Sequence, residues 1–249
     1  MSYLLGFWLL SFLTGNPLLA GLLVLVVWWS ADRVTFGLLP DPFRHLARAR
    51  RRAELRRTLA ENPHDRRARF ELAELLLEQG RSRAAVETLR PNVEAGDDDV
   101  YTAFTMGAAM ARAGFFPQAE QVLGAAKELD PGFRDGEIEL ELGRMRLASG
   151  DLAGARASLE RLLAVRPGSV EGRYWLAQAL ARAGDAEGAR RLREEAWREY
   201  AQLPRFRRRA DRWFAWRCQP WRPVAVAAAV VLALFVIGSL VCGGPGGAG

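Results

Sequence analysis

Apolar residues follow two different patterns along this chain. Residues 3–29 and 224–242 are almost continuously apolar, and no Asp, Glu, Lys or Arg occurs before Asp32 or after Arg222. In the region between them, charged residues alternate with leucine and alanine at a spacing typical of solvated helices. We therefore expect two apolar segments at a membrane and a charged helical region between them.

Three markers recur in the charged region with a nearly constant period. Glycine occurs at four positions that are 34, 36 and 34 residues apart, namely Gly80, Gly114, Gly150 and Gly184. Alanine follows each glycine after five positions, at Ala85, Ala119, Ala155 and Ala189. Proline occurs at Pro63, Pro131 and Pro167, with Asp97 where one more is expected. This period is typical of stacked repeats, so residues 64–203 are predicted to hold four of them.

Each repeat is predicted to be a pair of antiparallel helices, with approximate bounds 66–99, 100–133, 136–169 and 170–203. In the first helix a large apolar residue precedes a small one, at Leu72-Ala73, Met106-Gly107, Leu142-Gly143 and Leu176-Ala177. In the second helix one position holds Leu89, Leu123, Leu159 or Arg193. Because a small residue at a crossing lets two helix backbones approach, we expect close packing within each pair. Stacked pairs then bury the apolar faces that one repeat leaves exposed.

These residues and spacings resemble the tetratricopeptide repeat, a helix–turn–helix unit used mostly to hold other proteins. The resemblance covers about 140 residues and implies an all-α fold, a superhelical solenoid, here flanked by transmembrane helices at both ends. Three departures stand out: Arg146 lies where the first helix often carries an aromatic, Asp97 replaces a proline, and two residues are inserted near Arg134-Asp135. We expect these departures to loosen the third repeat or to bend the stack locally.

The resemblance also implies that the first helix of each repeat lines a concave groove. The candidate groove residues are Arg67, Phe70, Glu74, Glu78, Tyr101, Phe104, Thr105, Arg112, Glu137, Glu141, Arg144, Glu171, Tyr174, Gln178 and Arg182. Aromatics beside arginines are typical of a peptide-binding surface, although Phe70, Phe104 and Tyr174 fit interhelical packing equally well.

The expected groove carries a gradient of charge. Some family members hold a C-terminal carboxylate at positions occupied here by Phe70, Glu74 and Ala108, so that clamp is not expected. The first repeat is acidic, whereas later repeats carry Arg112, Arg144 and Arg182. Such a gradient can orient a client that has one basic and one acidic end.

The N-terminal segment, residues 1–30, is predicted to be a transmembrane or re-entrant segment. Its apolar residues, as one helix, would rise about 40 Å against a hydrocarbon core of about 30 Å. Asn16-Pro17 favours a break, so a kinked span and a hairpin that dips in and returns both stay open. We expect no cleaved signal peptide, because the first residues lack a basic region.

Basic and aromatic residues flank both apolar segments. Residues 31–63 are predicted to form a juxtamembrane helix and a capping half-repeat, residues 204–223 an interfacial segment, 224–242 a transmembrane helix and 243–249 a disordered tail. The candidate membrane-interface residues are Trp28, Trp29, Arg33, Arg48, Arg50, Arg51, Arg52, Arg207, Arg208, Arg209, Trp213, Trp216 and Trp221. Because arginine-rich loops near a span stay cytoplasmic, the repeats are expected on the cytoplasmic side. Interleaved Arg and Trp also suit single-stranded nucleic acid, but the adjoining apolar segment favours a bilayer over nucleic acid.

No catalytic, metal or cofactor site is expected. The net charge is +6. The two cysteines, Cys218 and Cys242, do not make the set of four or more that a disulfide framework needs. His45 and His64 have no Cys or carboxylate neighbours at the spacing of metal ligands. Nucleotide loops and hydrolase motifs are absent from the sequence. Lys127 is the only lysine, which we interpret as a compositional sign of a bacterium.

The sequence thus predicts a membrane-tethered, non-catalytic scaffold that binds a protein or peptide client at the cytoplasmic face of a bacterial inner membrane. The alternative is a structural subunit or assembly factor of a larger complex for envelope biogenesis.

Overall fold

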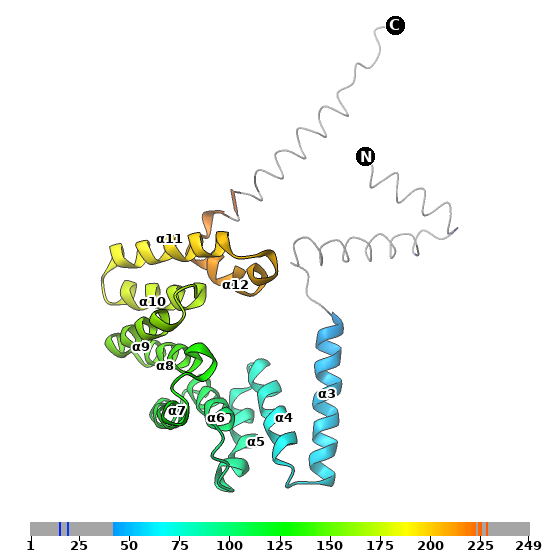
Figure 1. Cartoon of the computed structure of the whole chain (residues 1–249). Coiled ribbons are helices and arrows are strands. Elements are labelled where there is room, and N and C mark those ends of the chain that lie inside the picture. Colours follow the sequence, from blue (N-terminus) through cyan, green and yellow to red (C-terminus); the bar gives the residue numbers. More distant parts are fainter. Residues whose placement is uncertain (1–14, 16–18, 20–41, 223, 226–227, 229–249) are drawn as a thin grey trace. The chain divides into compact units, whose positions relative to one another are not determined.

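The computed structural model describes residues 42–222 and five isolated positions outside that range, Gly15, Leu19, Val224, Ala225 and Ala228 (Figure 1). Among these residues every regular element is a helix, in agreement with the predicted all-α fold. None of the described helices is long and apolar enough to cross a bilayer. The two predicted membrane segments, 3–29 and 224–242, fall outside the described residues apart from those five positions.

The chain divides into two units, residues 1–54 and 55–249. Helix α3 (Pro42–Glu61) runs through the boundary between them. Within the second unit, Leu55 is buried in a core cluster with Leu72 and Leu76, and Leu59 packs against that cluster. The last turns of α3 therefore cover the apolar side of the first repeat.

Four helix pairs follow α3 and stack in the order of the sequence (Figure 1). They are α4 (Arg66–Glu78) with α5 (Ser82–Glu94), α6 (Val100–Ala113) with α7 (Phe116–Leu129), α8 (Glu137–Ser149) with α9 (Leu152–Val165), and α10 (Val170–Arg182) with α11 (Ala186–Gln202). Helix α12 (Arg205–Cys218) follows and packs against α10 and α11. These pairs form a solenoid of helix–turn–helix units.

Helix starts and turns follow directly from local sequence. The side chains of Asp65, Asp99, Asp151, Ser169 and Asp185 each accept a hydrogen bond from a backbone N–H in the first turn of the helix that follows. The four periodic glycines all have positive φ, between 73° and 93°. Residues with a Cβ atom rarely adopt this backbone conformation, which explains why glycine recurs at each reversal of the chain.

Within the second and third pairs, a glycine of the first helix lies directly against a leucine of the second. A Cβ at Gly107 would lie 2.7 Å from Cγ of Leu123, and one at Gly143 would lie 2.6 Å from Cγ of Leu159. Both leucines are fully buried. In the first and fourth pairs the same position holds Ala73 and Ala177, which are also fully buried. The predicted close packing at the small residue is confirmed.

The two-residue insertion forms the short 3₁₀ turn η1 (Phe133–Asp135). Arg134 and Asp135 have positive φ, at 46° and 54°. The turn places Phe133, which is 3% exposed, against the rings of Tyr101 and Phe104, at centroid distances of 5.0 and 5.1 Å. The turn that contains the insertion therefore holds a buried aromatic side chain between α6 and α8, where we had expected a looser repeat.

Helix α12 has one packed face and one exposed face. Phe214, Ala215 and Cys218 join a cluster with Val170 and Ala196 of the fourth pair. Burial raises the pKa of the Cys218 thiol to about 11, so this cysteine stays protonated and unreactive at neutral pH. Trp213 in this helix is more than half exposed, and so is Trp221, which follows the helix.

The contact between Gly143 and Leu159 generates a stability prediction. Gly143→Ala should lower the free energy of unfolding by about 1–3 kcal/mol, because the added carbon overpacks a filled crossing. The matched change Gly124→Ala, within α7 where a Cβ would meet nothing within 4 Å, should raise it by about 0.5–1 kcal/mol through helix propensity. Urea unfolding of the full chain followed by circular dichroism measures both. Equal effects of the two substitutions would contradict the packing argument.

Candidate protein-binding groove

The first helices of the pairs lie on the inner side of the stack. Neighbouring first helices contact one another directly, α4 with α6, α6 with α8 and α8 with α10, and α12 contacts α10 in turn. Each second helix from α5 to α9 packs mainly between two first helices. The first helices are therefore closer together and form the shorter, concave side, which makes them the candidate walls of a groove.

A pocket of about 330 Å³ opens among α6, α8 and α10. Three arginines line it, Arg112, Arg144 and Arg182, together with Glu141. The remaining walls are largely apolar and include Trp175, Met145 and Phe116 at the start of α7. A few polar groups set in an apolar lining are what a specific binding site requires.

Glu141 holds two of the arginines in place. Its carboxylate, in a residue only 3% exposed, accepts hydrogen bonds from Nε of Arg112 at 2.8 Å and from Nη1 of Arg144 at 3.1 Å. Charge-assisted bonds of this kind are stronger and more directional than neutral ones. The pair joins α6 to α8 and orients both guanidinium groups at the pocket.

Trp175 and Glu171 continue the network onto α10. The guanidinium of Arg144 lies over the Trp175 ring, 5.4 Å from its centroid, and Nε1 of Trp175 donates to Glu171 at 3.1 Å. Burial raises the pKa of Glu171, an effect that the Trp175 hydrogen bond and the charge of Arg144 only partly offset. Arg182 donates from Nη1 to the carbonyl of Leu147 at 2.9 Å, which ties α10 to the end of α8.

The opposite end of the groove is acidic. Burial raises the pKa of Glu74 on α4; the nearby charge of Arg134 opposes the rise, and Glu78 and Glu71 add to it. The Arg134 guanidinium lies 5.1 Å from the ring centroids of both Tyr101 and Phe133. The inserted turn therefore places a cationic group beside the aromatic rings at the start of α6.

The structure sorts the predicted groove residues into three sets. Arg112, Glu141, Arg144 and Arg182 come together at the pocket, with Glu171 beside them. Phe70, Phe104, Tyr174 and Thr105 take part in helix packing, and Thr105 is only 4% exposed. The others lie elsewhere on the first helices: Arg67, Glu74, Glu78, Tyr101, Gln178, and Glu137, which pairs with Arg166 at 3.4 Å.

Trp175, which lines the pocket, is not among the groove residues predicted from the sequence. The predicted residue is the neighbouring Tyr174, which packs closer to Phe214 of α12, at a centroid distance of 5.6 Å against 6.4 Å for Trp175. Adjacent positions on a helix differ by about 100° in direction, so an error of one position changes the face. The two aromatics differ in one contact between repeats: the Arg144 guanidinium of the third repeat lies over the ring of Trp175.

The predicted membrane-interface residues occupy three places. Trp28, Trp29 and Arg33 lie outside the described residues. Arg48, Arg50, Arg51 and Arg52 lie on α3 and are exposed or half-buried. On and just after α12, Arg207, Arg209, Trp213 and Trp221 are exposed, whereas Arg208 and Trp216 are half-buried and Arg208 donates to the carbonyl of Leu203 at 2.7 Å.

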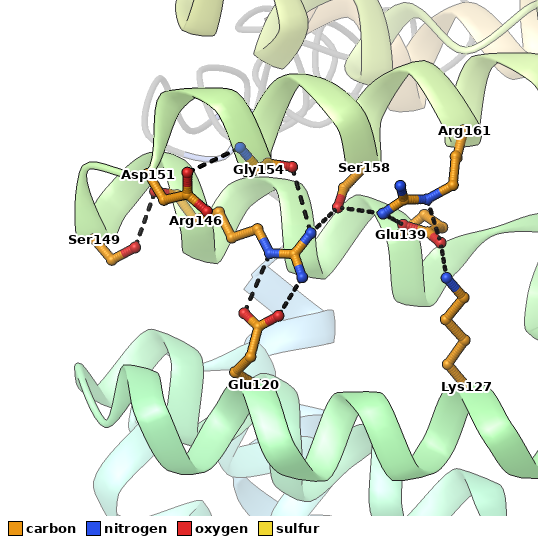
Figure 2. Close-up of polar contacts among 9 residues, drawn as sticks. All are labelled: Glu120, Lys127, Glu139, Arg146, Ser149, Asp151, Gly154, Ser158 and Arg161. Carbon is orange, nitrogen blue, oxygen red and sulfur yellow. Dashed lines mark hydrogen bonds and ion pairs between the residues drawn. The ribbon is translucent and has the colours of Figure 1, made fainter.

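A second polar network supports α8 from the side away from the groove (Figure 2). Arg146 of α8 contacts Glu120 of α7 and donates to Oγ of Ser158 on α9 at 2.7 Å. The carboxylate of Glu139, a residue 6% exposed, pairs with Lys127 at 2.6 Å and with Arg161 at 3.0 Å (Figure 2). Arg146 therefore replaces the aromatic of related repeats with polar bonds to both neighbouring helices.

Among the described residues no cluster of three or more His, Cys, Asp or Glu side chains is placed to hold a metal ion.

The stacked helix pairs with a concave, charged groove define an α-solenoid repeat protein. The model of the tetratricopeptide repeat family matches residues 46–103 and 146–208. The tetratricopeptide repeats that the sequence predicted are therefore confirmed in these residues.

Solved structures share this fold. A thermophilic tetratricopeptide repeat protein of Thermus thermophilus, TTC0263, is 24% identical with a TM-score of 0.51, over 64% of this chain and 88% of that one. MamA of Desulfovibrio magneticus RS-1 is 15% identical with a TM-score of 0.57, over 65% and 91%. Another MamA structure is 16% identical with a TM-score of 0.53, over 61% and 87%. No curated protein matches significantly, and at these identities the structural likeness concerns the fold alone.

The Glu139 network generates a pH prediction. Burial alone would raise the pKa of Glu139, but hydrogen bonds and charges from Arg161 and Lys127 outweigh it and lower the pKa. A lowered carboxyl pKa stabilises the fold above the unfolded value, near 4.5, and this contribution disappears as the pH falls through the folded value.

Glu139→Gln should therefore reduce the free energy of unfolding by about 1–2 kcal/mol at pH 7, with the difference from the wild type shrinking below about pH 4. Urea unfolding across this pH range measures the difference. The control Glu160→Gln removes an exposed pair with Arg156 on α9 and should leave stability nearly unchanged at every pH. A Glu139 effect independent of pH would contradict the ionic explanation.

Proposed function

We propose that this protein is a non-catalytic scaffold that holds a protein client in the groove formed by α4, α6, α8 and α10. The observation that carries the proposal is the pocket lined by Arg112, Arg144, Arg182 and Trp175 on the concave side. Arginine and tryptophan are the residues most enriched where interfaces derive their binding energy. Solenoids of this kind present such a continuous concave face to their partners.

We further propose that the apolar segments 3–29 and 224–242 anchor the solenoid to a bacterial inner membrane, with the repeats on the cytoplasmic side. The sequence supports this through the two uncharged ends and the arginines beside them. The exposed Trp213 and Trp221 are compatible with it, because tryptophan is enriched where protein meets the lipid headgroups. An anchored scaffold raises the effective concentration of its client near the bilayer without any catalysis.

The client proposal predicts where crosslinks form. A photoreactive amino acid at Tyr101 or Arg182, both exposed on first helices, should crosslink a discrete protein in the organism's own membranes. The same amino acid at Arg83 or Arg190, exposed on second helices, should yield little or none of that product. Equal yields at all four positions, or products only from the second helices, would overturn the groove assignment.

The membrane proposal predicts resistance to alkaline carbonate. The full chain should remain in the membrane pellet after carbonate extraction, because two apolar segments are buried in hydrocarbon. A reporter enzyme fused after Gly249 should be active only outside the cytoplasm. Release by carbonate would refute the anchors, and a cytoplasmic reporter would refute the proposed orientation.

A further inference from the structure

The pocket among α6, α8 and α10 has an excess of positive charge. Its lining holds three arginines and a single carboxylate, that of Glu141, which gives a net charge of +2. Glu171 lies 3.6 Å from Arg144 at the edge of the pocket, and counting its charge still leaves an excess of one. The pocket walls are therefore electrostatically complementary to an anion.

Most hydrogen-bond donors of these arginines are uncommitted. A guanidinium has five N–H donors. Within the described part of the chain, Arg112 donates only through Nε, to Glu141, and Arg144 and Arg182 each donate only through Nη1. Several N–H groups of each arginine can therefore reach a ligand.

The ends of α6 and α8 border the pocket. The carbonyl groups at the end of a helix carry partial negative charge. At the end of α6, the carbonyls of Met110 and Ala111 already accept hydrogen bonds from Phe115 and Gly114. At the end of α8, the carbonyl of Leu147 accepts from Arg182. The carbonyls of these three residues therefore already accept hydrogen bonds within the fold.

The pocket also offers an apolar surface beside the arginines. Trp175, Met145 and Phe116 contribute to its walls. Its volume of about 330 Å³ equals the share of roughly ten water molecules in the liquid. This is enough for one acidic and one large apolar side chain, but not for a folded domain.

The arginines come from three successive first helices, α6, α8 and α10. Arg112 and Arg144 donate to the same Glu141 carboxylate, so their guanidinium groups lie side by side, and Arg182 lines the same pocket. One acidic group that enters the pocket can therefore meet more than one arginine. The apolar walls beside the arginines favour an acidic side chain with an apolar neighbour, as a segment within a chain provides.

We propose that this pocket binds an extended segment of the client that places an acidic side chain among Arg112, Arg144 and Arg182 and a neighbouring large apolar side chain against Trp175. This inference rests on the proposed scaffold function and specifies its ligand. Glu141 is a positioning residue, because its carboxylate orients two of the arginines that meet the ligand. The acidic α4 end of the groove repels the same side chain and so favours one register.

Capped peptide pools test this directly. Each pool consists of fluorescent, acetylated and amidated peptides with random sequence around one fixed pair, either glutamate or glutamine followed by phenylalanine. A third pool carries the glutamine pair and a free C-terminal carboxylate. Fluorescence polarisation with the full chain in detergent micelles should show about tenfold tighter binding of the glutamate pool than of either glutamine pool at low salt.

Arg182→Glu is the informative variant, because Arg182 does not pair with the buried Glu141 and its loss leaves that carboxylate satisfied. It should remove the preference for glutamate. Arg190→Glu, an equal charge change on the exposed side of α11, should retain it. Unchanged circular dichroism of both variants shows that the solenoid is intact.

The outcomes separate this inference from the scaffold proposal. Preference for a glutamine pool, equal binding of all pools, binding of none, or equal loss in both variants would overturn the acidic ligand. Preference for the free carboxylate would replace it with recognition of a chain end. If groove crosslinks still form in membranes, the scaffold proposal survives any of these results.

Discussion

The close crossing of antiparallel helices is the constraint on which this structure depends. At Gly107 and Gly143 the second helix approaches so closely that even one added carbon would meet a fully buried leucine. Such an approach brings both helices of a pair within reach of the next pair. Stacking then buries apolar faces that no single pair can cover, and the same geometry draws the first helices together on the inner side. The groove is therefore a consequence of packing within the pairs.

Polar side chains hold the third pair between its neighbours. On one side Arg146 and Glu139 bond to α7 and α9, and on the other side Glu141 joins α6 to α8. Glu141 pairs with two arginines, so the pairing leaves an excess of positive charge at the groove. Structural support and the charge of the pocket thus have the same origin.

Helix α12 connects the groove to the chain that follows it. Its Phe214 packs on Tyr174 of α10, one residue before the tryptophan of the pocket, while Trp213 is exposed. In the proposed function this helix lies between the client site and the membrane anchor. The repeats would then be held close to the bilayer by a packed helix instead of a loose linker, which limits the directions from which a client can enter.

The sequence by itself determined the helix pairs, their period and the turns, because each depends on local chemistry such as glycine at positive φ and aspartate at helix starts. The resemblance of its repeats to the tetratricopeptide family also placed Arg112, Glu141, Arg144 and Arg182 among the candidate groove residues. Only the tertiary structure decided which aromatics are accessible. Phe104 packs against Phe133, and Tyr174 packs against Phe214 of α12, whereas Trp175 contacts Phe214 and also lines the pocket. These outcomes depend on contacts between residues far apart in the chain, and periodicity within one helix carries no information about them.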